Sequence, residues 1–225
     1  MLKKRVLTGA LIAGCALSAH ALNTGPGDFE LKLGLFNSSQ GKAQNISVQG
    51  LIGDHYSASH RHNTKGLLGL GYFVQVGEKD NSSFSVGLEG YYLSKTSVGG
   101  NILVEQQFEN LGYGYEARHI PVLLSAKANI SKPSSKYGLI LSGGIGPNFV
   151  ETSNYKEHSL DGGITIPRDS FVGKSSIKLS ASMGVGIELK EAIGKRPIDC
   201  GYRFFYLGRT GLNRNNALIN KNLST

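Results

Sequence analysis

The chain has 225 residues, of which 31 are glycine and none is tryptophan, and its formal net charge is +8. This length suits one domain, and the composition favours turns and sheet over helix. Because the basic residues are scattered without a dense run, the charge argues against a nucleic-acid partner and suits anionic lipid head groups equally well.

The first 21 residues, MLKKRVLTGALIAGCALSAHA, have the three parts of an export signal. A basic head precedes a short apolar run, and Ala19–Ala21 forms a small-x-small cleavage site. We therefore predict a signal peptide over 1–21, with Leu22 as the first residue of the mature protein.

A lipobox-like stretch at 12–15 offers an alternative to this cleavage. It would make Cys15 the lipidated first residue of an anchored protein. Ordinary cleavage instead discards Cys15 and leaves Cys200 as the only thiol, so no intramolecular disulfide is expected. Beyond the signal, no segment offers the roughly 20 apolar residues of a transmembrane helix.

Seven later segments alternate apolar and polar side chains with period two, the pattern of a strand with one apolar face. The clearest is SIKLSASMGVGIEL at 176–189. It exceeds the roughly 9 to 11 residues with which a tilted strand crosses a bilayer. The predicted strands are 29–36, 66–76, 83–94, 108–130, 137–150, 176–189 and 200–208.

Short turns alternate with long loops between these strands, which is the plan of a bacterial outer-membrane barrel. A sheet in hydrocarbon must close, because each unpaired backbone group at an edge would cost several kcal/mol. We therefore predict an all-β fold over 22–225, an eight-stranded antiparallel up-and-down transmembrane β-barrel. The turns are predicted at 77–82, 131–136 and 190–198, and the loops at 37–65, 95–107 and 151–174.

The segment that supplies the eighth strand is left open by the sequence. The tail after Gly208, RTGLNRNNALINKNLST, alternates poorly and has no terminal aromatic residue. Three alternatives follow: NALINKNLST at 216–225 closes the barrel, NISVQGLI at 45–52 is recruited, or the chain is truncated.

Four stretches resemble the opacity-type family of small outer-membrane barrels, also called the porin-like β-barrel domain family: GLEGYY, HIPVLLSAKANI, LILSGGIGPNF and GYRFFYLG. The resemblance covers about 29–210. It implies an eight-stranded barrel with mobile surface loops, used in adhesion or envelope integrity, and no shared catalytic site. It also implies the barrel-assembly machinery as a partner.

Charged side chains of both signs fall on the inward parity of several predicted strands. An eight-stranded barrel has an interior just wide enough to be filled by side chains. We therefore predict a lumen plugged by ion pairs, with Glu89 and Arg203 as the first pair to test, and a narrow ion path as the alternative. The inward residues are Glu30, Lys32, Gln75, Glu89, Lys127, Lys178, Glu188 and Arg203. The interfacial aromatic girdle is expected to include Tyr91, Tyr92, Tyr202 and Tyr206.

The stretch DHYSASHRHN at 54–63 contains the residue types of a nucleophile, a base and an orienting acid. They are Asp54, His55, Ser57, Ser59, His60 and His62. Some barrels hydrolyse acyl chains of lipid A or phospholipid with such groups, and the histidines could also bind zinc. We expect a solvated loop, because neighbours in a mobile loop are rarely held at catalytic geometry. No catalytic residue, cofactor or metal ligand is assigned.

The predicted function is that of a non-enzymatic outer-membrane protein of a Gram-negative bacterium. Its loops would serve surface interaction, adhesion or envelope integrity, because loops on a rigid scaffold carry function. The expected partners are outer-membrane lipid and lipopolysaccharide, the assembly machinery, and a host or surface ligand. The alternatives are an acyl-hydrolysing barrel, a narrow-pore porin, and a soluble periplasmic or lipid-anchored β-protein.

Overall fold

The computed structural model describes residues 13–23, 27–38, 43–59, 63–132, 134–193, 196–215 and 219–224. No helix in this part of the chain is long and apolar enough to cross a membrane. The strands are β1 (Ala13–Asn23), β2 (Gly27–Ser38), β3 (Gln44–Ile46), β4 (Asp54–Tyr56), β5 (Asn63–Lys79), β6 (Ser82–Val104), β7 (Phe108–Ile130), β8 (Tyr137–Ser159), β9 (Phe171–Val172), β10 (Ser175–Ile193), β11 (Arg196–Tyr206) and β12 (Asn213–Arg214).

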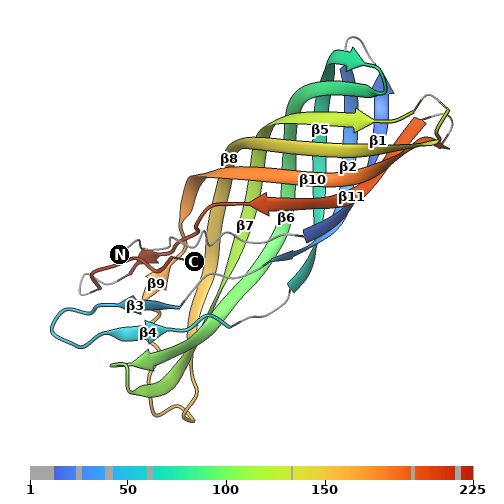
Figure 1. Cartoon of the computed structure of the whole chain (residues 1–225). Helices are drawn as coiled ribbons and strands as arrows, with labels where there is room; N and C mark the ends of the chain where they lie inside the picture. The colour runs from blue at the N-terminus through green and yellow to red at the C-terminus, as the bar shows by residue number, and fades with distance from the viewer. Residues whose placement is uncertain are drawn as a thin grey trace, which may run out of the picture.

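Eight of these strands form a closed antiparallel barrel (Figure 1). The pairing order is β6-β5-β2-β1-β11-β10-β8-β7, and β7 pairs with β6 to complete the ring. Strands that follow one another in the chain are neighbours around the wall, so the barrel has up-and-down topology. The structure confirms the predicted fold class, and closure leaves no barrel strand with a bare backbone edge.

The closing strand is β1, which pairs with β2 on one side and with β11 on the other. Neither internal alternative was right: only Asn45 and Ile46 of NISVQGLI belong to a strand, β3, which lies outside the ring, and the described residues of 216–225 make only isolated bridges, Ile219 to Val48 and Ser224 to Gly211. Most of β1 falls in the predicted signal peptide, and no strand was predicted there, because the apolar run of an export signal and a membrane strand have similar compositions.

The outer face of the barrel is a belt of exposed apolar side chains. On β10 the side chain of Leu179 is 65% exposed and that of Met183 is 72% exposed, while Ser180 and Ser182 are buried. The same alternation on β2 exposes Leu33 and Leu35 and buries Glu30 and Lys32. The predicted apolar parity is therefore confirmed, and a surface of this kind suits the hydrocarbon of a bilayer.

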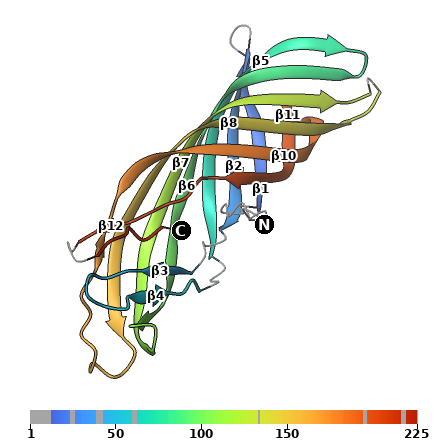
Figure 2. The same cartoon turned by 60° about the vertical axis from the view of Figure 1, so that its left-hand side comes forward.

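Three strands, β6, β7 and β8, continue past the rim of the barrel toward β3, β4 and β9 (Figures 1 and 2). Register shifts between Leu93 and Thr96 and between Gly114 and Glu116 accompany this exit. Such bulges bend strands and increase their twist. We call the structure beyond the rim the loop layer; it comprises the described residues 43–59, 95–118, 150–174, 208–215 and 219–224.

The predicted loops are therefore wrong in part. The stretch 95–107 is mostly strand, with turn residues only at 105–107, and 151–174 begins as the end of β8. The stretch 37–65 contains β3 and β4. β3 and β4 lie outside the barrel ring, so their polar residues do not alternate with the exposed apolar set of the barrel wall.

The loop layer has its own hydrophobic core, which consists largely of aromatic rings. The ring of Tyr56 lies 5.2 Å from that of Tyr113 and 5.7 Å from that of Phe171, and Tyr155 lies 5.5 Å from Phe171. Leu212 from the C-terminal segment is fully buried among these residues. Segments far apart in the sequence are therefore packed into one body above the barrel.

An arginine in the apolar belt should destabilise the barrel. Met183 lies near the middle of β10, so Met183→Arg places a charge near the centre of the bilayer and should lower the free energy of unfolding by about 2–4 kcal/mol. The matched control is Ile164→Arg, because Ile164 is 84% exposed in the loop layer. Urea unfolding in lipid vesicles measures both, and equal effects would contradict a lipid-facing β10.

The first residue of the membrane-extracted protein tests how β1 is used. Cleavage after Ala21 would remove all of β1 except Leu22 and Asn23 and would uncover the edges of β2 and β11. If the predicted signal peptide is removed, the chain starts at Leu22. If β1 closes the barrel, the chain still contains Ala13. N-terminal sequencing distinguishes these two outcomes directly.

Candidate functional site

The lumen of the barrel holds a layer of alternating charges. Glu89 accepts a hydrogen bond from Arg203, whose Nη1 lies 2.7 Å from Oε1, and it also pairs with Lys32. The Nζ of Lys32 lies 3.1 Å from Oε2 of Glu30, which in turn pairs with Lys127. Because acids and bases alternate along this chain of contacts, the charges compensate one another where water is excluded.

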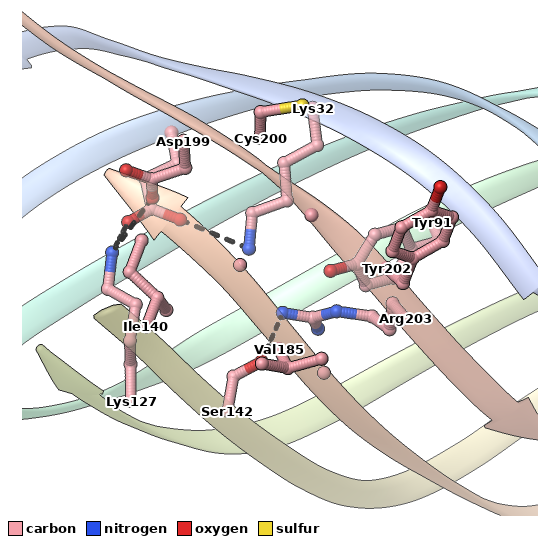
Figure 3. Close-up of a pocket in the computed structure, with 14 residues that line it drawn as sticks. Lys32, Tyr91, Lys127, Ile140, Ser142, Val185, Asp199, Cys200, Tyr202 and Arg203 are labelled. Atoms are coloured by element: carbon pink, nitrogen blue, oxygen red, sulfur yellow. Dashed lines mark hydrogen bonds and ion pairs between the residues drawn. The ribbon is translucent and has the colours of Figure 1, made fainter. Parts of the chain in front are cut away.

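The layer is completed by Asp199, whose Oδ2 lies 3.6 Å from Nζ of Lys127 (Figure 3). Aromatic faces support the cations: both Lys32 and Lys127 lie over the ring of Phe73, at 5.0 and 5.1 Å from its centroid. The guanidinium of Arg203 lies 5.4 Å from the ring centroid of Tyr91. Such contacts are favourable for cations that have lost part of their hydration.

Glycine on the neighbouring strand makes room for the guanidinium. A Cβ atom at Gly184 would lie 2.6 Å from Oγ of Ser142 and 3.4 Å from Nε of Arg203. These are the two groups that bond to each other, since Nη2 of Arg203 donates to Ser142 Oγ at 3.1 Å. Gly184 therefore provides space for the charge layer.

An apolar layer separates these charges from the loop layer. It consists of Phe36, Leu67, Tyr91, Leu93, Leu123, Phe205 and Leu207. All seven side chains are buried, and the rings of Tyr91 and Phe205 meet edge to face at 5.0 Å. The cavity beside the charge layer measures about 50 Å³, which accommodates a few water molecules.

The structure brings together five of the predicted interior charges: Glu30, Lys32, Glu89, Lys127 and Arg203. A sixth, Glu188, is buried and accepts a hydrogen bond from Asn129 Nδ2 at 2.5 Å. Lys178 is half-buried near the loop end of β10 and joins no ion pair among the described residues, and Gln75 is exposed and bonds to Glu78. The charge layer therefore includes fewer residues than the parity of the predicted strands indicated.

Sequence reasoning missed Asp199 and misplaced Tyr91. Asp199 fell between the predicted turn 190–198 and the predicted strand 200–208, although it lies in β11 and has the same parity as Arg203. Tyr91 was expected in the interfacial girdle, but it is 3% exposed and its hydroxyl donates to Oε2 of Glu89 at 2.5 Å. Tyr91 has the same parity as Glu89 on β6, so the sequence pattern could have placed it in the lumen. Tyr92 and Tyr202 are exposed, as a girdle requires.

The loop cluster predicted at 54–63 is divided between two faces. Asp54 accepts a hydrogen bond from the backbone N–H of Glu105 at 3.0 Å. His55 instead bonds to Asn45, and the hydroxyl of Ser57 donates to the carbonyl of Asn101 at 3.0 Å. No nucleophile–base contact joins His55 and Ser57. His60 and His62 lie outside the described residues, and Ser59 bonds to the carbonyl of Gly99.

A buried carboxylate organises the end of the loop layer. Glu157 accepts hydrogen bonds from the backbone N–H groups of Arg168 at 3.0 Å and Ser170 at 3.1 Å. The hydroxyl of Tyr155 donates to it at 2.6 Å. Burial is the main cause that raises the pKa of Tyr155 and of Tyr56 above the ordinary value, so both hydroxyls remain donors.

Within the described ranges, no three His, Cys, Asp or Glu side chains are grouped as a metal site would require. The arrangement of the lumen is suited to stable packing, because acids and bases are paired beside a cluster of buried, mostly apolar side chains.

No family model and no curated protein matches this chain. Among solved structures, the translocator domain of the autotransporter NalP from Neisseria meningitidis is 7% identical and covers 88% of both chains, with a TM-score of 0.33. The outer membrane protease OmpT from Escherichia coli is 8% identical, with 88% of this chain and 93% of that chain covered and a TM-score of 0.32. At such TM-scores neither likeness carries an argument, and the opacity-type resemblance stays a prediction.

Removing one partner from the charge layer should destabilise the barrel strongly. Glu89→Gln leaves Arg203 and Lys32 without their shared carboxylate and should lower the free energy of unfolding by about 3–5 kcal/mol. Adding Arg203→Met should restore part of this loss. The control is Glu116→Gln, because the Glu116–Lys95 pair is exposed and is worth less than about 1 kcal/mol. Equal losses in urea unfolding would contradict a buried charge layer.

Proposed function

We propose that the protein is a non-enzymatic outer-membrane β-barrel of a Gram-negative bacterium that presents its loop layer for surface interaction. The observation that carries this proposal is the difference between the filled lumen and the loop layer. The lumen is occupied by paired charges and an apolar layer. The loop layer is instead a separate packed body with exposed loops.

The packing of the loop layer supports a binding role. A flexible loop loses conformational entropy when it binds, whereas a preorganised surface loses less. Here hydrogen bonds hold the loop tips together: Ile52 N donates to Glu105 at 3.1 Å, and Asn110 donates to Thr165 at 3.0 Å. The tips also expose large aliphatic side chains, including Ile164 and Ile166. Exposed apolar groups on an ordered scaffold are typical of interaction surfaces.

The remaining partners and alternatives follow from the same geometry. The proposed lipid partners are outer-membrane lipid and lipopolysaccharide, which would contact the apolar belt, and the assembly machinery would insert the barrel. An acyl hydrolase receives no support from the loop cluster, since His55 bonds to Asn45 and Ser57 to the backbone of Asn101. Adhesion and envelope integrity are the two forms of the proposal that experiments must separate.

Disrupting the core of the loop layer should weaken surface interaction without removing the barrel. The double variant Tyr56→Ala/Phe171→Ala deletes two buried rings, each worth about 3–5 kcal/mol of packing. Bacteria expressing it should attach less to cultured epithelial cells than bacteria expressing the unaltered protein. Heat-modifiable gel migration verifies that the barrel persists, and Leu35→Ala on the lipid face is the matched control.

Envelope integrity predicts a different pattern. A strain without the protein would become sensitive to detergent, and the loop-layer variant would restore its resistance because the barrel alone suffices. Restored resistance together with unchanged attachment would contradict the proposed surface role.

The filled lumen should conduct no ions. Purified protein in planar bilayers is expected to give no discrete current steps, because the apolar layer around Leu123 and Phe205 lies across the path. Steady single-channel steps from the unaltered protein would overturn this expectation and favour the narrow-pore alternative.

A further inference from the structure

The loop layer contains a cavity of about 290 Å³ that no part of the proposed function explains. It lies where the β3–β4 connection, the stretch before β9 and the C-terminal segment meet. Ile46, Tyr56 and Ile219, all buried, line it with apolar surface. Its size is at the lower end for ligand pockets, which suits a single side chain or a small molecule.

Two carboxylates with fixed orientation form part of the cavity wall. On β4, Asp54 and Tyr56 share one face, and both line the cavity. Oδ1 of Asp54 is held by the backbone N–H of Glu105 at 3.0 Å, and Oδ1 of Asp169 by the backbone N–H of Glu157 at 2.9 Å. These bonds set the direction of each carboxylate and do not use Oδ2. The pair of acids is therefore anchored rather than mobile.

The electrostatic surroundings of the cavity are negative although the chain as a whole carries +8. Burial is the largest cause that raises the pKa of Asp54 above its ordinary value; the hydrogen bond from Glu105 lowers it, the charges of Glu105 and Glu157 raise it, and Arg168 lowers it. With Asp169, the surroundings of the cavity contain four carboxylates and two guanidinium groups, those of Arg168 and of Arg214, which donates to the carbonyl of Ile219 at 3.0 Å. A cation placed beside Asp54 would relieve this imbalance.

We propose that this cavity binds a primary ammonium group carried on an aliphatic chain, as in a lysine side chain or a free alkylamine. The ammonium would pair with Asp54 and Asp169, and the methylene groups would lie on Ile46 and Ile219. The proposal rests on the interaction role of the loop layer and names the chemistry that it recognises. An apolar floor with acids on the wall matches a cation that carries its own apolar stem.

The exposed Arg168 on the cavity wall favours a ligand with one positive charge over a ligand with several. Its positive charge disfavours polycations that would extend past it, so a single terminal ammonium fits better than a densely charged ligand. The ring of Tyr56 adds a surface to which an ammonium is attracted.

Calorimetric titration of the full chain in lipid nanodiscs tests the proposal, with pentylamine as probe and 1-pentanol as its uncharged match. Pentylamine should bind at least about tenfold more tightly than pentanol. Asp54→Asn keeps the shape and the acceptor for Glu105 N but removes the charge, and it should weaken pentylamine binding about tenfold or more. Asp161→Asn is the control, because Asp161 lies in the connection between β8 and β9 that also carries Asp169, bonds to Thr165 and lies outside the cavity.

The source of the ammonium is resolved by two further probes. Binding of Nα-acetyl-lysine methylamide supports a lysine of a partner protein, and binding of hexylamine without binding of the lysine derivative supports a free alkylamine. The affinity for pentylamine should fall as the pH is lowered through the range in which Asp54 protonates. The other charged groups near Asp54 are Glu105, Glu157, Asp169 and Arg168. This direction follows because a neutral carboxyl group no longer attracts the ammonium.

Three results would overturn the proposal: no binding of any amine at about 10 mM, equal binding of pentanol and pentylamine, or unchanged affinity in Asp54→Asn. None of them would refute the surface role itself, which fails only if the Tyr56→Ala/Phe171→Ala variant attaches normally. Heat-modifiable migration of each variant excludes loss of the barrel as the cause.

Discussion

Backbone pairing in hydrocarbon is the constraint on which the structure depends. Inside a bilayer no water is present to bond a bare N–H or C=O group, so a sheet there must close. The ring from β6 through β1 and back to β7 satisfies this requirement with strands that are all antiparallel to their neighbours. It does so by using Ala13–Asn23 as the eighth strand, the segment whose composition also predicts a cleavable export signal.

Closure with eight strands determines what the interior contains. Once the apolar residues of each strand face lipid, the alternate residues must share a narrow lumen. Charges placed there are tolerable only in pairs, and Glu89 accordingly serves both Arg203 and Lys32. The apolar layer then separates this network from the loop layer. Under the proposed function, binding is therefore assigned to the loop layer and not to the lumen.

Period-two alternation in the sequence was enough to predict which side chains of the barrel strands are exposed and which are buried. Leu179 and Glu89 were placed on the correct faces because each lies in a strand whose two sides meet different media. The Glu89–Arg203 contact followed from parity together with charge. The strands of the loop layer could not be found in this way, since both faces of β3 and β4 are set by tertiary packing with segments far along the chain. The cavity beside Asp54 depends on the same long-range contacts.

Labelling along β8 tests the lipid-facing sheet most directly. Leu139 and Leu141 are exposed on the barrel, and Ile140 between them is buried. Nitroxide labels at these positions, in a background with Cys15 and Cys200 replaced by serine, report their surroundings through relaxation by oxygen and by a polar nickel complex. We predict strong oxygen and weak nickel effects at 139 and 141, weak effects of both at 140, and a strong nickel effect at 164. Nickel effects at 139 and 141 as large as at 164 would place this face in water and contradict the account.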